Sequence, residues 1–337
     1  ETSADRQKFS LDLELDTDIG AVRLPKGKIA PPEAMWGRYW YRSSTNETMK
    51  KELKGIVNEI TDRVKWEQGN VWLDIACNDG TLLSNIPDGF VKIGIDPCDD
   101  SFREESSKHG LIVQDYFSKR AYDTVTTHKA KVITCIAMFY DLDNPHTFIQ
   151  DLYDVLDDNG IIVLQMSYTP LMLQQMAFDN ICHEHLMYYS LHSFKYVADK
   201  ANFKIVDCEL NDVNGGSFRV YIKKENADIT KFATRPYRDV CELRLESIYN
   251  WETTLENNLG TLAGQKTQAA ADATAYAAIS ASPSISPSIS PSKSPSASLS
   301  PSLSPSRSPS LSPSLSPSVS PSSSPSRCPT ACRSRPS

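Results

Sequence analysis

The chain has 337 residues, 40% of them hydrophobic and 23% charged, and a formal net charge of −7. From about residue 280 it is almost only Ser and Pro, with five basic residues and no acid, so the remainder carries −12. Such a tail cannot bury enough apolar surface to offset the entropy of ordering, which predicts a disordered low-complexity segment at 280–337. An acidic body argues against nucleic acid as a partner, because bulk charge would repel phosphates.

Cysteine spacing and hydropathy exclude further classes. No apolar stretch approaches the ~20 residues of a membrane span, and the first 18 residues lack a signal-peptide core. Cys328 and Cys332 have nothing nearby that completes a zinc set. The other cysteines are isolated and typical of reduced, buried thiols: Cys77, Cys98, Cys135, Cys182, Cys208 and Cys241. We therefore expect a cytoplasmic protein with no membrane partner and no metal. The sequence does not indicate an oligomeric state.

The predicted elements begin with a loose leader at 1–34 and an amphipathic helix at Met49–Val64. Short β-branched runs then alternate with helical stretches, among them a helix at Pro145–Leu156. The expected strands are Val71–Ile75, Val91–Asp96, Leu111–Val113, Lys131–Ile136 and Ile161–Gln165, the last opened by a turn at 158–160.

Two later runs, Phe203–Glu209 and Phe218–Lys223, are joined by Asn214-Gly215-Gly216 and predict an antiparallel pair. A mostly parallel seven-stranded sheet ending in such a pair is the Rossmann-like α/β arrangement of class I methyltransferases. We expect this domain at 35–226. A helical extension, the start of a truncated second domain, is expected at 227–279.

Acidic residues follow three successive strands. Asp74 ends the first strand and leads into a tight turn whose Gly80 precedes an expected helix, so that backbone N–H groups can meet a ligand. Asp96 can accept hydrogen bonds from a ribose diol, and Asp115 from an adenine amino group. A dinucleotide site would need Gly-x-Gly-x-x-Gly, of which only one glycine is present. The prediction is S-adenosylmethionine as the cofactor, bound by Asp74, Ala76, Asn78, Gly80, Asp96 and Asp115.

The densest cluster of chemistry-bearing residues is 178–190, and three of the six histidines lie between His183 and His192. If this segment is extended, His183 and His185 face one way and Glu184 the other. A His beside a carboxylate is a plausible general base near neutral pH. Two alternatives stay open. Cys182, His183 and His185 could bind a metal ion, although this set lacks a fourth ligand. The imidazoles could instead have a purely structural role, hydrogen-bonded to the backbone.

These motifs resemble the sugar methyltransferases typified by the nucleotide-sugar C-methyltransferases, over about Trp36–Tyr221. The resemblance implies that His185 removes a proton beside a sugar ketone, that Glu184 orients it or contacts sugar hydroxyls, and that His183 supports it. It also implies a substrate pocket that includes Tyr39, Tyr41, Tyr188 and Asn214. The shared segments are 39–44, 48–49, 78–83, 94–97, 138–142, 179–190 and 214–221.

The chain departs from that family pattern at several positions. Ala76 stands where Gly is usual, Cys182 replaces Tyr, Asp141 replaces a His, and Asn214 replaces His or Thr. The cysteine-rich zinc ribbon and most of the second Rossmann-like domain are expected to be missing. C-methylation of a sugar or nucleotide-linked ketosugar is therefore the leading hypothesis. O-methylation, with His185 or Asp141 deprotonating a hydroxyl, and a non-catalytic interaction protein on a Ser-Pro stalk are the alternatives.

Overall fold

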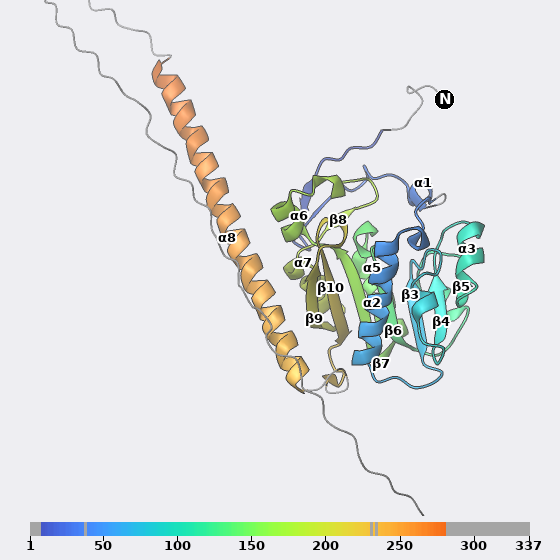
Figure 1. Cartoon of the computed structure of the whole chain (residues 1–337). Helices are drawn as coiled ribbons and strands as arrows, with labels where there is room; N and C mark the ends of the chain where they lie inside the picture. The colour runs from blue at the N-terminus through green and yellow to red at the C-terminus, as the bar shows by residue number, and fades with distance from the viewer. Residues whose placement is uncertain (1–7, 37–38, 230–231, 233–234, 281–337) are drawn as a thin grey trace, which may run out of the picture. The chain divides into compact units, whose positions relative to one another are not determined.

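The structure is a computed structural model (Figure 1), and it describes residues 8–36, 39–229, 232 and 235–280. The chain divides into two units, Glu1–Ala277 and Ala278–Ser337. The Ser-Pro tail predicted at 280–337 lies outside the described residues except for Ser280.

A seven-stranded sheet with the order β5-β4-β3-β6-β7-β10-β9 forms the centre of the first unit. Its parallel strands are β3 (Val71–Ile75), β4 (Val91–Ile95), β5 (Leu111–Val113), β6 (Ala130–Ile136) and β7 (Leu156–Ser167). β10 (Ser217–Lys224) is antiparallel to both β7 and β9 (Phe203–Asn211). The predicted Rossmann-like methyltransferase fold, with its antiparallel C-terminal pair, is confirmed.

The turn expected at 158–160 differs from the structure, because β7 already begins at Leu156. The register between β6 and β7 shifts between Ala130 and Val132. Gly160 lies at this irregularity, where a Cβ atom would meet the Ala130 carbonyl oxygen at 3.0 Å. Residues 158–160 therefore form a β-bulge inside β7, and Gly160 allows the close backbone contact at this bulge.

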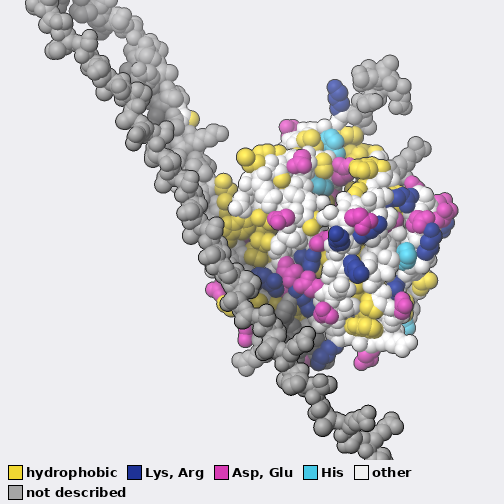
Figure 2. Space-filling view, in the orientation of Figure 1, with side chains coloured by type: hydrophobic (Ala, Val, Ile, Leu, Met, Phe, Trp, Pro, Cys, Tyr) yellow, Lys and Arg dark blue, Asp and Glu magenta, His cyan; other side chains and the backbone are white. Residues whose placement is uncertain are grey.

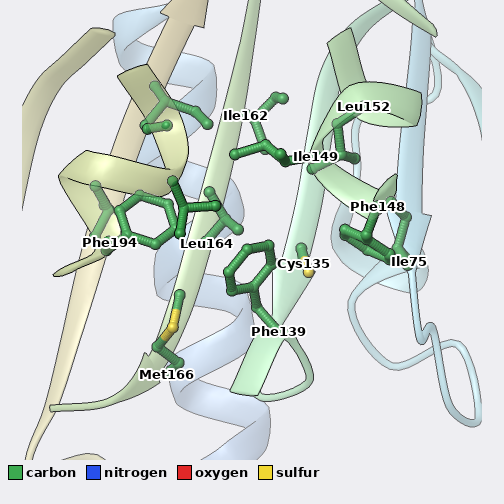
Figure 3. Packing of buried hydrophobic residues seen from close by; sticks show 14 of the residues in the cluster. Ile75, Cys135, Phe139, Phe148, Ile149, Leu152, Ile162, Leu164, Met166 and Phe194 are labelled. Carbon is green, nitrogen blue, oxygen red and sulfur yellow. The ribbon is translucent and has the colours of Figure 1, made fainter. Parts of the chain in front are cut away.

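Apolar residues cover both faces of the sheet, because adjacent side chains of a strand point in opposite directions. On one face α2 (Glu47–Arg63) packs over Trp72, and Figure 1 shows this helix in front of the sheet. On the other face α5 (Pro145–Val155) and α7 (Leu191–Lys200) pack over Ile75, Cys135 and Leu164. Figure 3 shows this second layer.

Phe139 stands between Phe148 of α5 and Phe194 of α7, with ring centroids 5.8 and 5.5 Å away. Its short helix η4 (Phe139–Asp141) begins three residues after the end of β6. The burial of this ring therefore fixes the backbone that follows β6, and this backbone positions Asp141.

The expected loose leader is wrong for residues 14–24. β1 (Glu14–Asp16) and β2 (Ala21–Arg23) form a second, three-stranded sheet with β8 (Met187–Tyr188). Ile19, Ala21 and Leu24 belong to the main core. Arg23 is 1% exposed and donates to Asp16 at 3.2 Å and to Asp143. Strands of three residues carry too little periodicity to be seen in a sequence, because their pairing partner supplies most of their order.

The remaining elements are short. The helices are α1 (Pro32–Trp36), α3 (Asp100–Ser106), α4 (Lys119–Asp123) and α6 (Thr169–Gln175), and the other 3-10 helices are η2 (Ser43–Thr45), η3 (Leu83–Asn85), η5 (Phe178–Asn180) and η6 (Val213–Gly215). Among the described residues, no helix combines the length and apolar character that crossing a membrane requires.

The long helix α8 (Arg235–Ser280) occupies the stretch where a helical extension was expected at 227–279. Its Glu252 is 1% exposed and accepts hydrogen bonds from the backbone N–H of Leu191 at 2.5 Å, from that of His192 at 3.0 Å and from the Tyr168 hydroxyl. Ile248 of the same helix belongs to the main core. The first half of α8 is therefore part of the methyltransferase unit, and its carboxylate caps α7.

Candidate active site

A cavity of about 320 Å³ opens at the carboxyl ends of β3, β4 and β6. This is the edge of an open α/β sheet where ligands bind. Apolar side chains form most of the wall, including Ile75, Leu82, Ile95 and Met138. The lining includes these residues predicted from the sequence: Tyr39, Tyr41, Asp74, Ala76, Asn78, Asp96 and Asp141.

The loop after β3 lies in a conformation that few residues adopt. Ala76 has φ 57°, Asn78 φ 52° and Gly80 φ 79°. A Cβ atom at Gly80 would meet the Ser106 Cα at 2.7 Å, so only glycine fits there. The loop leads into the short 3-10 helix η3, where an α-helix was expected. Backbone N–H groups of the loop itself, more than a helix dipole, are therefore available to a ligand.

Asp96 is held by two backbone amides. Its Oδ2 accepts from Asn78 N at 2.7 Å and its Oδ1 from Cys98 N at 2.8 Å, and the residue is 6% exposed. Each carboxylate oxygen has a second lone pair, so both can still accept from a ligand. The carboxylate is thus fixed at the cavity wall in an orientation suited to two hydroxyl groups of one ribose.

Asp74 lies deeper than Asp96, and its Oδ1 accepts from the Thr134 hydroxyl at 2.6 Å. Burial raises the pKa of Asp74 to about 7, the charge of Asp96 adds to this rise, and the Thr134 hydrogen bond opposes it. Thr134, which sequence reasoning missed, therefore anchors this carboxyl group.

Asp115 is not where the sequence-based prediction placed it. Its side chain is exposed, its Oδ1 accepts from Tyr116 N at 2.8 Å, and it is not part of the cavity lining. The next two residues, Tyr116 and Phe117, do line the cavity. The side chain of a residue after a strand end can point toward the cavity or toward solvent. Here the rings of Tyr116 and Phe117, which were not predicted from the sequence, line the cavity in place of the Asp115 carboxylate.

The cavity fits S-adenosylmethionine on these observations. Two carboxyl groups stand at the ends of adjacent strands, a loop that requires glycine passes close by, and apolar walls suit an adenine ring and a thioether chain. Asp74, Ala76, Asn78 and Asp96 would hold the cofactor. Gly80 does not line the cavity, but it allows the conformation of the loop after β3.

His185 is not itself part of the cavity lining, although the next residue, Leu186, is. The His185 ring is held in one tautomer. Its Nδ1 lies 2.8 Å from the carbonyl oxygen of Asn180. Because a carbonyl oxygen can only accept, Nδ1 carries the proton and Nε2 keeps a free lone pair. The ring packs on Tyr140 at a centroid distance of 4.2 Å. Burial lowers the pKa of His185, against the opposing effects of the Asn180 hydrogen bond and the Glu184 charge, so the imidazole is neutral at neutral pH.

Asn180 connects His185 to the glycine turn between β9 and β10. Its Nδ2 donates to the Asn214 carbonyl oxygen at 3.1 Å. Asn214 itself has φ 52°, and a Cβ atom at Gly215 would meet Asn180 Nδ2 at 3.0 Å. Asn214, predicted as a substrate contact, is not part of the cavity lining and supports the partner of His185. Asn180 lies in the cluster at 178–190, but its contact with His185 was not predicted from the sequence.

The rest of the His-Glu-His segment is not an extended strand, because residues 182–184 form a bend. Glu184 lies near Tyr39 and Asp141, where its charge adds to the effect of burial in raising the pKa of each. His183 packs against Phe9 at a centroid distance of 6.1 Å. The expected alternation of side chains therefore does not apply here.

Tyr188 belongs to β8, is 5% exposed, and does not line the cavity. It cannot provide the sugar-stacking surface expected of it without a rearrangement. Trp36, Tyr39 and Tyr41 provide such a surface instead: all three line the cavity, and the Trp36 and Tyr39 ring centroids are 5.3 Å apart. Within the described part of the chain, no group of three or more His, Cys, Asp or Glu could hold a metal ion.

A wider groove of about 780 Å³ lies beside the cofactor loop and α2. Its side chains carry both charges, with Arg42, Lys51 and Lys54 facing Asp79 and Glu104. Figure 2 shows this mixture of Lys, Arg, Asp and Glu over α2. An open groove of balanced charge offers no apolar wall to an adenine ring, so we place the cofactor in the smaller cavity.

Comparisons with known proteins agree with this geometry. Residues 45–207 match a protein-family model described as a methyltransferase domain. The chain is 21% identical to the C-methyltransferase NovU of Streptomyces niveus over 203 residues. This alignment covers 59% of this chain and 48% of NovU. The chain thus spans about half the length of the curated relative it matches.

Solved structures are similar over about half of the chain. Magnesium protoporphyrin IX methyltransferase from Synechocystis PCC 6803, with bound S-adenosylhomocysteine, is 11% identical with a TM-score of 0.42, over 53% of this chain and 88% of that one. The N-methyltransferase NodS from Bradyrhizobium japonicum WM9 is 11% identical with a TM-score of 0.39, over 53% and 98%. The family model thus matches slightly less than half of the chain, and its description is a methyltransferase domain.

Proposed function

We propose that this methyltransferase domain methylates a carbon atom of a ketosugar, free or linked to a nucleotide, with His185 as the general base. The observation that carries the proposal is the fixed tautomer of His185, whose Nε2 is free and whose pKa is lowered by burial. A neutral imidazole with a free lone pair can remove the weakly acidic proton beside a carbonyl group.

The residues of this chain divide the work between them. The cofactor, when bound, supplies an electrophilic methyl group. Asp96 holds the cofactor through hydrogen bonds, and the rings of Trp36, Tyr39 and Tyr41 form an apolar platform on which a sugar can stack. His185 holds the abstracted proton on Nε2, and Asn180 keeps its ring oriented through Nδ1.

Three features support the proposal. The segment 179–190 and the turn 214–221 resemble nucleotide-sugar C-methyltransferases. NovU, whose name describes a C-methyltransferase, is a distant relative. The aromatic platform lies in the wall of the same cavity as Asp96, so acceptor and cofactor can meet there.

The test is to incubate the full chain with S-adenosylmethionine and a panel of nucleotide-linked ketosugars and to locate the new methyl group by NMR. We expect a methyl group on the carbon beside the carbonyl. In D₂O without cofactor, the same carbon should exchange its proton for deuterium with the wild-type chain and not with His185→Gln. A methyl group on oxygen would establish the O-methyltransferase alternative and refute C-methylation.

A further inference from the structure

Asp141 occupies an unusual position for a carboxyl group. It follows β6 in η4, lines the cavity, and is half-buried, with its Oδ1 atom enclosed. Its Oδ1 has no hydrogen-bond partner among the residues that the structure describes. Its backbone N–H donates to the Met138 carbonyl at 2.9 Å, so the turn itself holds the residue in place. The side chain is thus presented to the cavity by the backbone, without a protein group to satisfy it.

The surroundings of Asp141 disfavour a negative charge. Burial raises the pKa of its carboxyl group well above the usual range, and the charge of Glu184 raises it further. No ion pair to Asp141 is found within the described part of the chain, and two of its other neighbours are the Tyr39 and Tyr140 phenols. An ionised carboxylate buried without a cation or a donor is costly, so the group takes a proton instead.

A protonated carboxyl group needs an acceptor for its O–H. Oδ1 has no partner among the described residues, and Asp141 lines the cavity, so a ligand bound there is an available acceptor for this O–H. We propose that Asp141 donates a hydrogen bond to the acceptor's carbonyl oxygen and stabilises the negative charge that develops there during methyl transfer. This inference rests on the proposed function and reverses the role expected from the sequence, where Asp141 was an alternative base.

The step balances with the residues named. His185 Nε2 takes the proton from the carbon beside the carbonyl, the C–H electron pair becomes the C=C bond of an enolate, and the carbonyl π pair moves onto oxygen. That oxygen accepts the hydrogen bond of Asp141. The electron pair on oxygen then re-forms the C=O bond, the C=C pair forms the new bond to the methyl carbon, and the electron pair of the broken S–CH₃ bond stays on sulfur. His185 finally releases its proton to solvent.

The geometry favours two residues working on one substrate from neighbouring positions. Leu186, next to His185, donates its backbone N–H to the Tyr140 carbonyl at 2.9 Å, and the His185 ring packs on Tyr140. Since Tyr140 directly precedes Asp141, the base and the proposed donor are fixed to one another by backbone and ring contacts. A lone oxyanion donor of this kind contributes on the order of 10²–10³ to turnover in other enzymes.

The experiment compares Asp141→Asn with Asp141→Leu, two side chains of similar size. The Asn amide keeps a neutral donor, so we expect turnover within about tenfold of wild type, while Leu should lower kcat by roughly 10²–10³. Because Asp141 lines the cavity, the affinity of each variant for S-adenosylhomocysteine is measured first, and kcat is compared at saturating cofactor. If Asp141 is a base, Asn lacks a proton acceptor of sufficient basicity and should lose as much as Leu. Equal losses in the two variants would overturn the proposal.

A second measurement does not depend on turnover. The infrared difference between the wild type and Asp141→Asn at pH 7, without ligand, should contain the carbonyl stretch of a protonated carboxyl group. A carboxylate band in its place would refute the proposed donor. If the protonated band is present and no ketosugar is methylated or exchanged by the wild type, the proposed function fails while the protonation state of Asp141 stands.

Discussion

At the scale of single residues, the account depends on one hydrogen bond. The Asn180 carbonyl fixes the proton of His185 on Nδ1, which leaves Nε2 as the basic atom. We expect His185→Gln to lower turnover by roughly 10²–10⁴, the usual contribution of a general base. The melting temperature and the affinity for S-adenosylhomocysteine should change little, because the residue does not line the cofactor cavity.

His183→Gln is the matched control for this variant. It makes the same replacement two residues away, on a ring that packs against Phe9. A loss of turnover in His183→Gln equal to that in His185→Gln, or a loss of stability in His185→Gln with turnover per folded molecule intact, would contradict the assignment of the base.

The pH dependence of activity follows from the environment of the same ring. Burial lowers the pKa of His185, and Glu184 and the Asn180 hydrogen bond oppose this without outweighing it. The active form is the neutral base, so kcat/KM should fall as the pH drops through that pKa. We expect the midpoint of this acidic limb below the ordinary value for histidine, about 6.5. A midpoint above that value in a pH profile would show that another group acts as the base.

At the scale of elements, the turn between β9 and β10 supports the base from a distance. Gly215 has φ 77°, and a Cβ atom there would meet Asn180 Nδ2 at 3.0 Å. Gly215→Ala should therefore displace η5 and lower turnover about tenfold or more, while cofactor affinity is kept. Gly27→Ala is the control, because Gly27 has φ 76° and open space around its Cβ position.

Both glycine variants should lose roughly 1–2 kcal/mol of unfolding free energy from the positive φ alone. Thermal unfolding and steady-state kinetics on the pair separate this backbone cost from the effect on His185. Normal turnover in Gly215→Ala would mean that Asn180 tolerates displacement and that the turn has no part in catalysis.

The elements that the sequence could predict are those with a strong local pattern. The buried strands around Leu73 and Val163 are short β-branched runs, and the Asn214-Gly215-Gly216 turn has the residues that positive φ requires. The residues of the site were harder to predict from the sequence. Asp74 and Asp96 follow from strand ends, whereas the orientation of Asp115 depends on a single backbone step after β5, and no local pattern determines it.

Other parts of the site depend on contacts between segments far apart in the chain. β1 and β2 are ordered by pairing with β8, about 165 residues later. Asn180 gains its role only when the bend at 182–184 brings His185 back to it. Such contacts leave no periodic trace in the sequence, because the residues involved are individually unremarkable in composition.

At the scale of the whole molecule, α8 completes the fold. Glu252 accepts hydrogen bonds from two backbone N–H groups of α7 and from Tyr168, and Ile248 is 6% exposed. A chain ending at Asn226 should therefore be less stable than one ending at Gly260, by several kcal/mol, because buried donors are left without their acceptor. Equal melting temperatures for the two truncated chains would show that α8 contributes nothing to the core.

The central claim is that the cavity at the ends of β3 and β4 holds S-adenosylmethionine, and calorimetric titration with S-adenosylhomocysteine tests it most directly. The wild type should bind. Asp96→Ala should bind at least tenfold more weakly, because a charge-assisted hydrogen bond contributes about 1.5–3 kcal/mol. Asp115→Ala, an exposed acid outside the cavity lining, should bind as the wild type does. No heat with the wild type, or an unchanged affinity in Asp96→Ala, would contradict the account.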